Sequence, residues 1–398
     1  MSGPAPRRPS TNFCATEIVA IDVAELAAEL IRAPSVTPDP GCAQDILIRV
    51  LEENGFTVTR LPFGEGTDRT PNFFARRGSG APHLCFAGHT DVVPPGTGAW
   101  THDPFSGVIS EGVIYGRGAC DMKGGIAAFV AGALAFLDHT PDFPGSVSLL
   151  ITGDEEGHAR HGTVKVLEWM QENGQIPDFC VVGEPTCPEA LGDMVKIGRR
   201  GSLNARITVR GRQGHVAYPH RADNPVHRLL RILDDLTRTP LDQGSRWFEP
   251  SGLQITSIDV GNTATNVIPA EAHAALNIRF NDLHTGASLE GWIRTICTRH
   301  VPDYEAVIHI SGESFLTSPG PETEALVAAV KEVTGQEPRL DTGGGTSDAR
   351  FIARCCAVAE FGLVGASMHQ IDEHVLVQDV HQLARIYELF LSRAAEAV

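Results

Sequence analysis

The chain has 398 residues, a formal net charge of −17 and 42% hydrophobic residues. Such an acidic protein lacks the positive charge with which proteins bind nucleic acid or anionic membranes, so we expect neither as its partner. The length and the ordinary hydrophobic content predict a globular protein of about two domains.

Residues 1–20 are rich in Pro, Ser and Arg, and we expect them to form a disordered lead-in. Helices are predicted at Val23–Ile31 and at about Ala43–Asn54. Strand-like and helix-like segments then alternate, which predicts an α/β fold whose mixed, largely parallel sheet is flanked by helices. The alternating segments are strands at 83–88, 146–152 and 179–184 and helices at 124–137 and 163–173.

The helix predicted at 124–137 is the longest apolar stretch of the chain. At about 1.5 Å per residue it is too short to cross a bilayer, so we expect a buried helix.

From Gly201 the pattern changes to the order strand, helix, strand, strand, helix, strand. This order predicts an inserted α+β, ferredoxin-like domain over residues 201–313. After Ser314 the first pattern returns, with a helix, a Gly-rich loop, a strand and a C-terminal helix. The main domain is therefore expected to comprise residues 21–200 and 314–398.

Polar residues follow the strand predicted at 83–88. His89 and Asp91 lie two residues apart, so in an extended segment they point to the same side. A carboxylate in that position can fix the tautomer of a metal-bound imidazole. Two polar residues in a surface loop would give the same pattern, and the pair alone does not decide between them.

Carboxylates occupy three further positions next to predicted strands or helices. Asp121 stands in a Gly-rich turn before the apolar helix, where it is either a helix N-cap or a ligand. Glu155 and Glu156 end an apolar strand, and their side chains diverge, so one can bind a metal while the other acts as a general base. A solvated acidic turn is the alternative.

Glu184 also ends an apolar strand, and His369 and His374 lie near the predicted start of the last helix. In open α/β sheets, ligands bind at the carboxyl ends of the strands. Mixed histidine and carboxylate ligands suit zinc or a similar divalent ion. These positions together therefore predict a metal site, with the choice between the two late histidines open.

Five motifs carry a family resemblance: GHTDVVPPG, GRGACDMKGG, GDEEG, VGEPT and GGGTSDARF. Their order resembles the zinc-dependent aminoacylase/carboxypeptidase family, from about Val23 to the C-terminus. The stretch GRRGSLNARITVRGRQGHVAYPHRADNPVHR resembles the members that hydrolyse N-succinyl-L,L-2,6-diaminoheptanedioate. This implies a cytoplasmic, homodimeric amide hydrolase with two Zn²⁺ per subunit, replaceable by Co²⁺, in the diaminopimelate and lysine pathway. Its products would be succinate and L,L-2,6-diaminoheptanedioate.

The resemblance implies a role for each matched residue. Asp91 would orient His89, Glu155 would be the general acid/base, and His215 would reach the partner subunit's site from the inserted lid and dimerisation domain. His374 then becomes a helix-start residue, and the Asp121–Met122 peptide bond would be cis. The implied metal ligands are His89 and Glu184 for one zinc, Glu156 and His369 for the other, and Asp121 as the bridge. The implied substrate contacts are Lys196, Arg199, Ser202, Tyr218, Asn266, Arg279, Gly345 and Thr346.

Local charge supports a small anionic N-acyl amino acid as the substrate. Lys196, Arg199 and Arg200 form a cationic cluster, and Arg279 and Arg350 follow later. Arginine binds carboxylates in a bidentate manner, and the succinylated substrate carries three carboxylates. A solvated basic face is the alternative explanation of the cluster.

Three residues depart from the family pattern, namely Ile197, Ala349 and Gly365, and none of them is an implied metal ligand. They bear on fine specificity, so another N-acyl amino acid such as N-acetylornithine, or a dipeptide, is the nearest rival substrate. A non-catalytic binding protein on this scaffold would have lost a ligand or the general base, and none is lost. A serine hydrolase would need a G-x-S-x-G motif, which the sequence lacks.

Nine cysteines are dispersed without a C-x-x-C pair, and no apolar leader segment precedes the first helix. Dispersed cysteines of this kind are typical of reduced thiols. Both observations agree with the cytoplasmic location that the resemblance implies.

Overall fold

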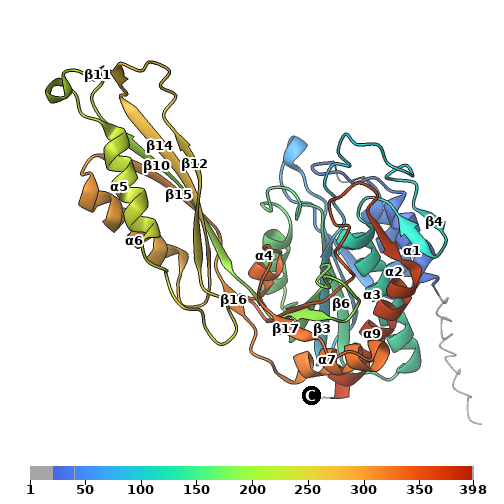
Figure 1. Ribbon diagram of the computed structural model, residues 1–398. Coiled ribbons are helices and arrows are strands. Elements are labelled where there is room, and N and C mark those ends of the chain that lie inside the picture. The colour runs from blue at the N-terminus through green and yellow to red at the C-terminus, as the bar shows by residue number, and fades with distance from the viewer. Residues whose placement is uncertain (1–20, 40, 397–398) are drawn as a thin grey trace, which may run out of the picture.

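The computed structural model describes residues 21–39 and 41–396, so the expected lead-in at 1–20 lies outside the described residues. Figure 1 shows a larger unit around a central sheet and a narrower unit that extends from it. The two chain segments between the units pair with each other as β9 (Gly198–Arg199) and β16 (Phe315–Leu316). We call this paired segment the neck.

The central sheet has eight strands in the order β1-β2-β6-β3-β7-β18-β8-β17. Four of its seven pairings are parallel, including those that join β6, β3, β7 and β18, so the sheet is mixed and largely parallel as predicted. The strands are β1 (Thr57–Arg60), β2 (Phe73–Gly78), β3 (His83–His89), β6 (Ser146–Thr152), β7 (Phe179–Val182), β8 (Met194–Lys196), β17 (Arg339–Asp341) and β18 (Ala357–Glu360).

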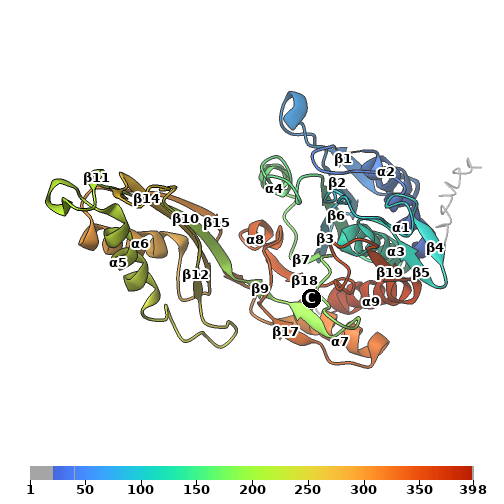
Figure 2. The same ribbon diagram turned by 45° about the horizontal axis from the view of Figure 1, so that its top comes forward.

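Helices cover both faces of this sheet (Figure 2). Along β3, Leu84 and Phe86 enter a core with α1, α2, α3, α7 and α9, whereas Cys85 and Ala87 face α4 and α8. This alternation follows from the two-residue period of a strand, and it explains why the run is apolar throughout. The helices are α1 (Val23–Ile31), α2 (Ala43–Glu53), α3 (Gly124–His139), α4 (Thr163–Glu172), α7 (Pro321–Thr334), α8 (Ala349–Ile352) and α9 (Val377–Glu396).

The helix α3 is the buried helix that its apolar sequence predicts. Together with the turn before it, α3 gives a segment, Ala119–His139, that is long and apolar enough to cross a membrane, but 89% of the most apolar part of this segment is buried inside the fold. It packs against α9 through Gly132, where an added Cβ would lie 2.4 Å from the carbonyl oxygen of Ala384. The glycine thus allows the two helix backbones to approach closely.

Gly132→Ala is expected to lower the free energy of unfolding by about 1–3 kcal/mol, because the new methyl group overlaps the α9 backbone. Urea unfolding followed by circular dichroism measures this loss. Gly291 in α6 (Gly286–His300) is a matched control, since an added Cβ there has nothing within 4 Å. Gly291→Ala should be neutral or stabilising. Equal stability of the two variants would contradict close packing at Gly132.

The narrower unit contains the predicted order of strands and helices between Gly201 and Gly312. Its antiparallel sheet has the order β12-β14-β10-β15, and α5 and α6 pack on one face over a separate core. This order is that of a ferredoxin-like module, as the sequence predicts. Its elements are β10 (Gly201–Arg210), α5 (Pro225–Thr237), β12 (Gly252–Asp259), β14 (Glu271–Phe280), α6 (Gly286–His300) and β15 (Tyr304–Gly312).

Short elements complete the fold. β11 (Gly214–His215) and β13 (Val267–Ile268) pair at the far tip of the narrower unit (Figure 1). β4 (Val108–Ser110), β5 (Val113–Tyr115) and β19 (His374–Leu376) form a small sheet. The placement of His374 at a helix start is therefore wrong: its backbone pairs with β5, and α9 begins only at Val377. Single turns of 3₁₀ helix lie at Gly66–Asp68 and Pro219–Arg221.

Candidate active site

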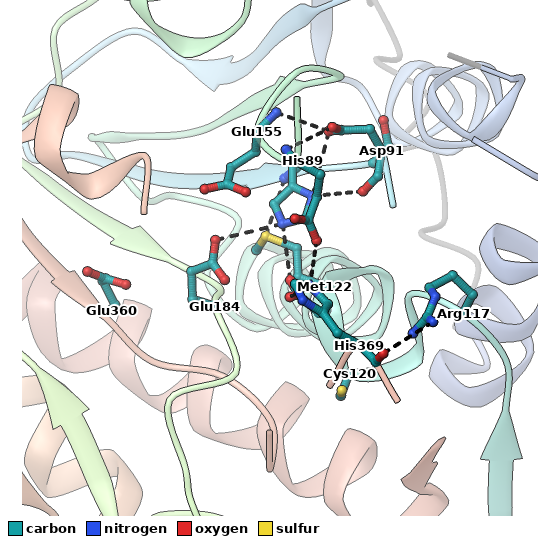
Figure 3. Close-up of polar contacts among 12 residues, drawn as sticks. His89, Asp91, Arg117, Cys120, Met122, Glu155, Glu184, Glu360 and His369 are labelled. Carbon is teal, nitrogen blue, oxygen red and sulfur yellow. Dashed lines mark hydrogen bonds and ion pairs between the residues drawn. The ribbon is translucent and has the colours of Figure 1, made fainter. Parts of the chain in front are cut away.

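Four neighbouring parallel strands end at the same edge of the central sheet. In the order β6-β3-β7-β18, they lead into Glu155 and Glu156, His89, Glu184 and Glu360 respectively. The register aligns His89 with Thr152, the last residue of β6. Figure 3 shows His89, Glu155 and Glu184 gathered at this edge. The strand-end rule thus explains why residues far apart in the sequence meet.

His89 is only 1% exposed, and each of its ring nitrogens faces an oxygen. Nδ1 lies 2.9 Å from the carbonyl oxygen of Asp91, so it is positioned to donate. Nε2 lies 3.1 Å from Oδ1 of Asp121 and 3.7 Å from Oε1 of Glu184. Because Nδ1 is engaged by that carbonyl, Nε2 is the ring nitrogen that faces these two carboxylates, either through its own proton or across a bound cation.

The buried Asp121 lies between the two histidines. Its Oδ1 faces His89, and its Oδ2 lies 3.2 Å from Nε2 of His369. The same His369 nitrogen lies 2.8 Å from Oε1 of Glu156. Asp121 sits in the irregular turn Ala119–Lys123, and the peptide bond to Met122 is cis, as the family resemblance implies.

The site concentrates negative charge in a buried place. Burial and the Glu184 carboxylate raise the pKa of Glu155 well above its ordinary value. Burial and the neighbouring Asp121 raise the pKa of Glu184 to about 8. Burial would also raise the pKa of Asp121, but its hydrogen bonds with His369 and His89 outweigh that effect and lower it. Burial would lower the pKa of His89, but its hydrogen bond with Asp121 outweighs that effect and raises it, and a hydrogen bond with Asp121 also raises the pKa of His369, to about 10. The clustered carboxylates thus favour positive charge on the two imidazoles or on a cation bound between them.

This donor set fits a pair of divalent cations. Among the described residues, three groups of three have ligand atoms within 4.8 Å of one another, and two of these groups contain Asp121. One group adds His89 and Glu184, and the other adds Glu156 and His369. A bound cation would compensate the clustered carboxylates, and nitrogen with oxygen donors suits zinc and its neighbours. Glu155 appears in a third group, with His89 and Glu156.

Asp91 lies where the sequence predicts it, but its carboxylate has a different principal contact. The carboxylate oxygen is 3.6 Å from Nδ1 of His89, beyond a hydrogen bond. It accepts instead from the backbone N–H groups of Glu155 (3.3 Å) and Glu156 (3.0 Å). Asp91 therefore orients the imidazole through its carbonyl and holds the loop of the two glutamates through its carboxylate.

The predicted substrate contacts divide into two sets, one near the neck and one at the tip. At the neck, Lys196 pairs with Asp341, and Arg199 pairs with Glu360 at 2.8 Å. Arg199 also donates to the carbonyl oxygen of Gly345 at 2.9 Å. Carboxylates of the chain itself therefore largely neutralise the predicted cationic cluster. The neck set consists of Lys196, Arg199, Ser202, Arg279, Gly345 and Thr346.

The tip set contains His215, Tyr218 and Asn266. His215 and Tyr218 are exposed, with ring centroids 5.7 Å apart, and the carbonyl oxygen of Asn266 accepts from the N–H of Val216. In Figures 1 and 2 the tip lies at the end of the narrower unit that points away from β3. The structure of one chain therefore does not bring these three residues to the metal-ligand candidates.

Three charged residues near the site were not predicted. Glu360 ends β18 just as Glu184 follows β7, so the strand-end rule could have identified it. Arg117 and Glu373 form an ion pair of 2.6 Å beside Asp121. Both lie in segments already noted for other residues, but only the tertiary structure brings them together.

Comparison with known proteins agrees with this geometry. The sequence profile of peptidase family M20/M25/M40 matches residues 85–393. The chain is 67% identical over 368 residues to a succinyl-diaminopimelate desuccinylase of Gluconacetobacter diazotrophicus, covering 92% of this chain and 96% of the relative. It is 58% identical over 380 residues to the desuccinylase of Caulobacter vibrioides, covering 94% and 96%.

Solved structures show the same fold. An M20 family metallo-carboxypeptidase of Sulfolobus solfataricus superposes with a TM-score of 0.74 at 18% identity, covering 94% of this chain and all of the other. The YXEP protein of Bacillus subtilis, named a dinuclear metal binding peptidase, superposes with a TM-score of 0.71 at 15% identity, covering 94% and 98%. With the extent of the family match and the identity to its relatives, these findings establish that the chain belongs to peptidase family M20/M25/M40.

Proposed function

We propose that the chain is a dinuclear metal-dependent amide hydrolase acting on N-succinyl-L,L-2,6-diaminoheptanedioate. Its products would be succinate and L,L-2,6-diaminoheptanedioate, in the diaminopimelate and lysine pathway. The observation that carries the proposal is the pair of donor groups that share Asp121, with Glu155 beside them. The names of relatives up to 67% identical supply the substrate.

His89 and Glu184 would hold one metal ion, Glu156 and His369 the other, and Asp121 both. We propose zinc, with cobalt as a substitute, because histidine and carboxylate donors suit these ions. Bound cations supply polarisation of the scissile carbonyl and a lowered pKa of the attacking water.

Glu155 is proposed as the group that moves the proton. Its carboxylate accepts a proton from the attacking water, whose oxygen adds to the amide carbonyl carbon. The same proton then passes to the amide nitrogen as the C–N bond breaks. The new carboxyl group gives up the remaining proton of the water to the released amine, so the products are the succinate carboxylate and the protonated amine. Asp91 holds the backbone of Glu155 during both transfers.

Substrate carboxylates would bind at the neck. Arg199 and Lys196 already contact chain carboxylates, so they contribute hydrogen bonds more than net charge. The charge of Arg350 acts on the buried carboxyl group of Asp348, whereas within the described residues no carboxylate forms an ion pair with Arg279. Arg279 is therefore the better source of net positive charge. Gly345, Thr346 and Ser202 lie in the same neck set.

The narrower unit, residues 201–313, is proposed as a lid and dimerisation domain, and residues 21–200 and 314–398 as the catalytic domain. The position of His215 at the tip supports a role toward a second subunit rather than its own. We therefore propose a cytoplasmic homodimer with a small anionic substrate and without nucleic-acid or membrane partners.

A substrate comparison on the zinc-loaded protein tests the function. Amine release is measured with N-succinyl-L,L-2,6-diaminoheptanedioate and with N-acetylornithine at matched concentrations. We expect turnover of the succinylated compound at least about 100-fold faster, because a site built for an extra carboxylate rejects a substrate without one. Comparable rates would leave the amide hydrolase but overturn the substrate, and faster turnover of N-acetylornithine would favour that rival.

A further inference from the structure

A buried ion pair joins Arg117 and Glu373 beside the candidate metal centre. Nη1 of Arg117 lies 2.6 Å from Oε2 of Glu373, and the two residues are 2% and 0% exposed. Neither residue is among the proposed ligands, acids, bases or substrate contacts. Figure 3 shows Arg117 next to the segments that carry Cys120 and His369.

Glu373 holds the backbone of the bridging aspartate. Its Oε1 accepts from the N–H of Cys120 at 3.1 Å and from the N–H of Asp121 at 3.3 Å. Asp121 has φ −122° and ψ 92°, which is outside the helical range, so the helix cannot satisfy these groups locally. The carboxylate therefore fixes the backbone of Asp121, whose side chain contacts both histidines.

Arg117 holds the other ligand loops. Its Nη1 donates to the carbonyl oxygen of Gln370 at 3.2 Å, and its Nη2 lies 3.4 Å from that of Pro94 and 3.5 Å from that of His369. Pro94 belongs to the loop after His89. His369 has φ +61°, a left-handed conformation that costs a non-glycine residue free energy, so its loop needs support.

Stability alone is a poor explanation for such a pair. Removing two charges from water costs several kcal/mol per ion, and well-packed apolar residues often serve stability as well or better. Residues that orient metal ligands, by contrast, commonly change metal affinity when they are replaced.

We infer that Arg117 and Glu373 are positioning residues that set the spacing of the His89, Asp121 and His369 loops for two metal ions. Through its hydrogen bonds, the buried pair links three separate chain segments, those of Pro94, Asp121 and His369. The inference rests on the proposed function only in taking these three residues as metal ligands.

Two variants test it. Glu373→Gln keeps the shape and one acceptor but removes the charge, and Arg117→Lys keeps the charge but loses the planar fork that reaches several carbonyls. If Glu373→Gln does not fold, Arg117→Lys decides the outcome. Gly132→Ala is the control for lost stability alone, since it lies between α3 and α9.

Metal binding is the readout, and it needs no substrate. The dissociation constants of both Zn²⁺ ions are measured by competition with a chelating dye, and the visible spectrum of the Co²⁺-loaded protein reports ligand geometry. We expect affinity for at least one ion to fall by about 10- to 100-fold in each folded pair variant, with an altered Co²⁺ spectrum. Gly132→Ala should keep both readouts at wild-type values.

Wild-type affinity and spectrum in the folded variants would overturn the inference and leave the pair a purely structural contact. An equal affinity loss in Gly132→Ala would overturn it as well. Failure of the wild-type protein to hydrolyse the succinylated substrate, with two ions bound, would instead refute the proposed substrate and leave the inference standing.

Discussion

Glu155→Gln is expected to lower kcat for the succinylated substrate by about 10²- to 10⁴-fold, the usual contribution of a general acid/base. A glutamine keeps the size of the side chain but cannot accept the proton of the attacking water. Steady-state kinetics on zinc-loaded protein give kcat and KM separately. We expect KM to change little, because no proposed substrate contact is altered.

Glu156→Gln is the matched control for this experiment. The two glutamates are adjacent and both backbones are held by Asp91, but only Glu156 contacts His369. We expect Glu156→Gln to weaken the binding of one metal ion, and Glu155→Gln to keep both. Loss of an ion from the Glu155 variant would contradict its assignment as the proton carrier and would make it a ligand.

Local sequence patterns predicted most of the fold. The helix Val23–Ile31 and the strand 146–152 were predicted with their observed bounds, since each carries its own apolar period or run. Strands of two or three residues, such as β8 and β17, were missed. Segments of two or three residues are too short to show a periodic pattern. They form strands only by pairing with a strand that lies far away in the sequence.

The candidate site was predictable where one rule applied repeatedly. A polar residue after a buried strand identifies His89, Glu155 and Glu184, because parallel strands end at one edge. The choice of His369 over His374 did not follow from that rule. It came from the family resemblance, and the structure places only His369 beside Asp121. The pairing of Arg117 with Glu373 bridges 256 positions, a distance at which local patterns carry no information.

The cationic cluster shows a second limit of sequence reasoning. Lys196 and Arg199 suggest a strongly positive patch when only their neighbours in the chain are considered. Their partners Asp341 and Glu360 stand 145 and 161 positions away, and the sheet brings them to the neck. The order of charged residues along the chain gives the net charge of the protein, but it does not show which charges are neutralised by partners that are distant in sequence.

His215→Ala is expected to lower kcat by about 10²- to 10³-fold, the usual cost of losing one donor to a developing oxyanion. The imidazole is exposed at the tip, its Nδ1 accepts from the N–H of Ala217, and it lies far from the candidate metal ligands of its own chain (Figures 1 and 2). The expected loss therefore requires that the residue act on the site of a second subunit.

Mixed dimers test this requirement. Subunits carrying His215→Ala and Glu155→Gln are co-expressed with different tags, and tandem purification isolates the heterodimer. One of its two sites then combines an intact Glu155 with an intact His215 from the other subunit, so about half of the wild-type activity should return although both homodimers are nearly inactive. If activity stays at the homodimer level, His215 serves its own subunit. That would require the narrower unit to fold back over the sheet edge by a large rotation at the neck, because the structure leaves the tip far from β3.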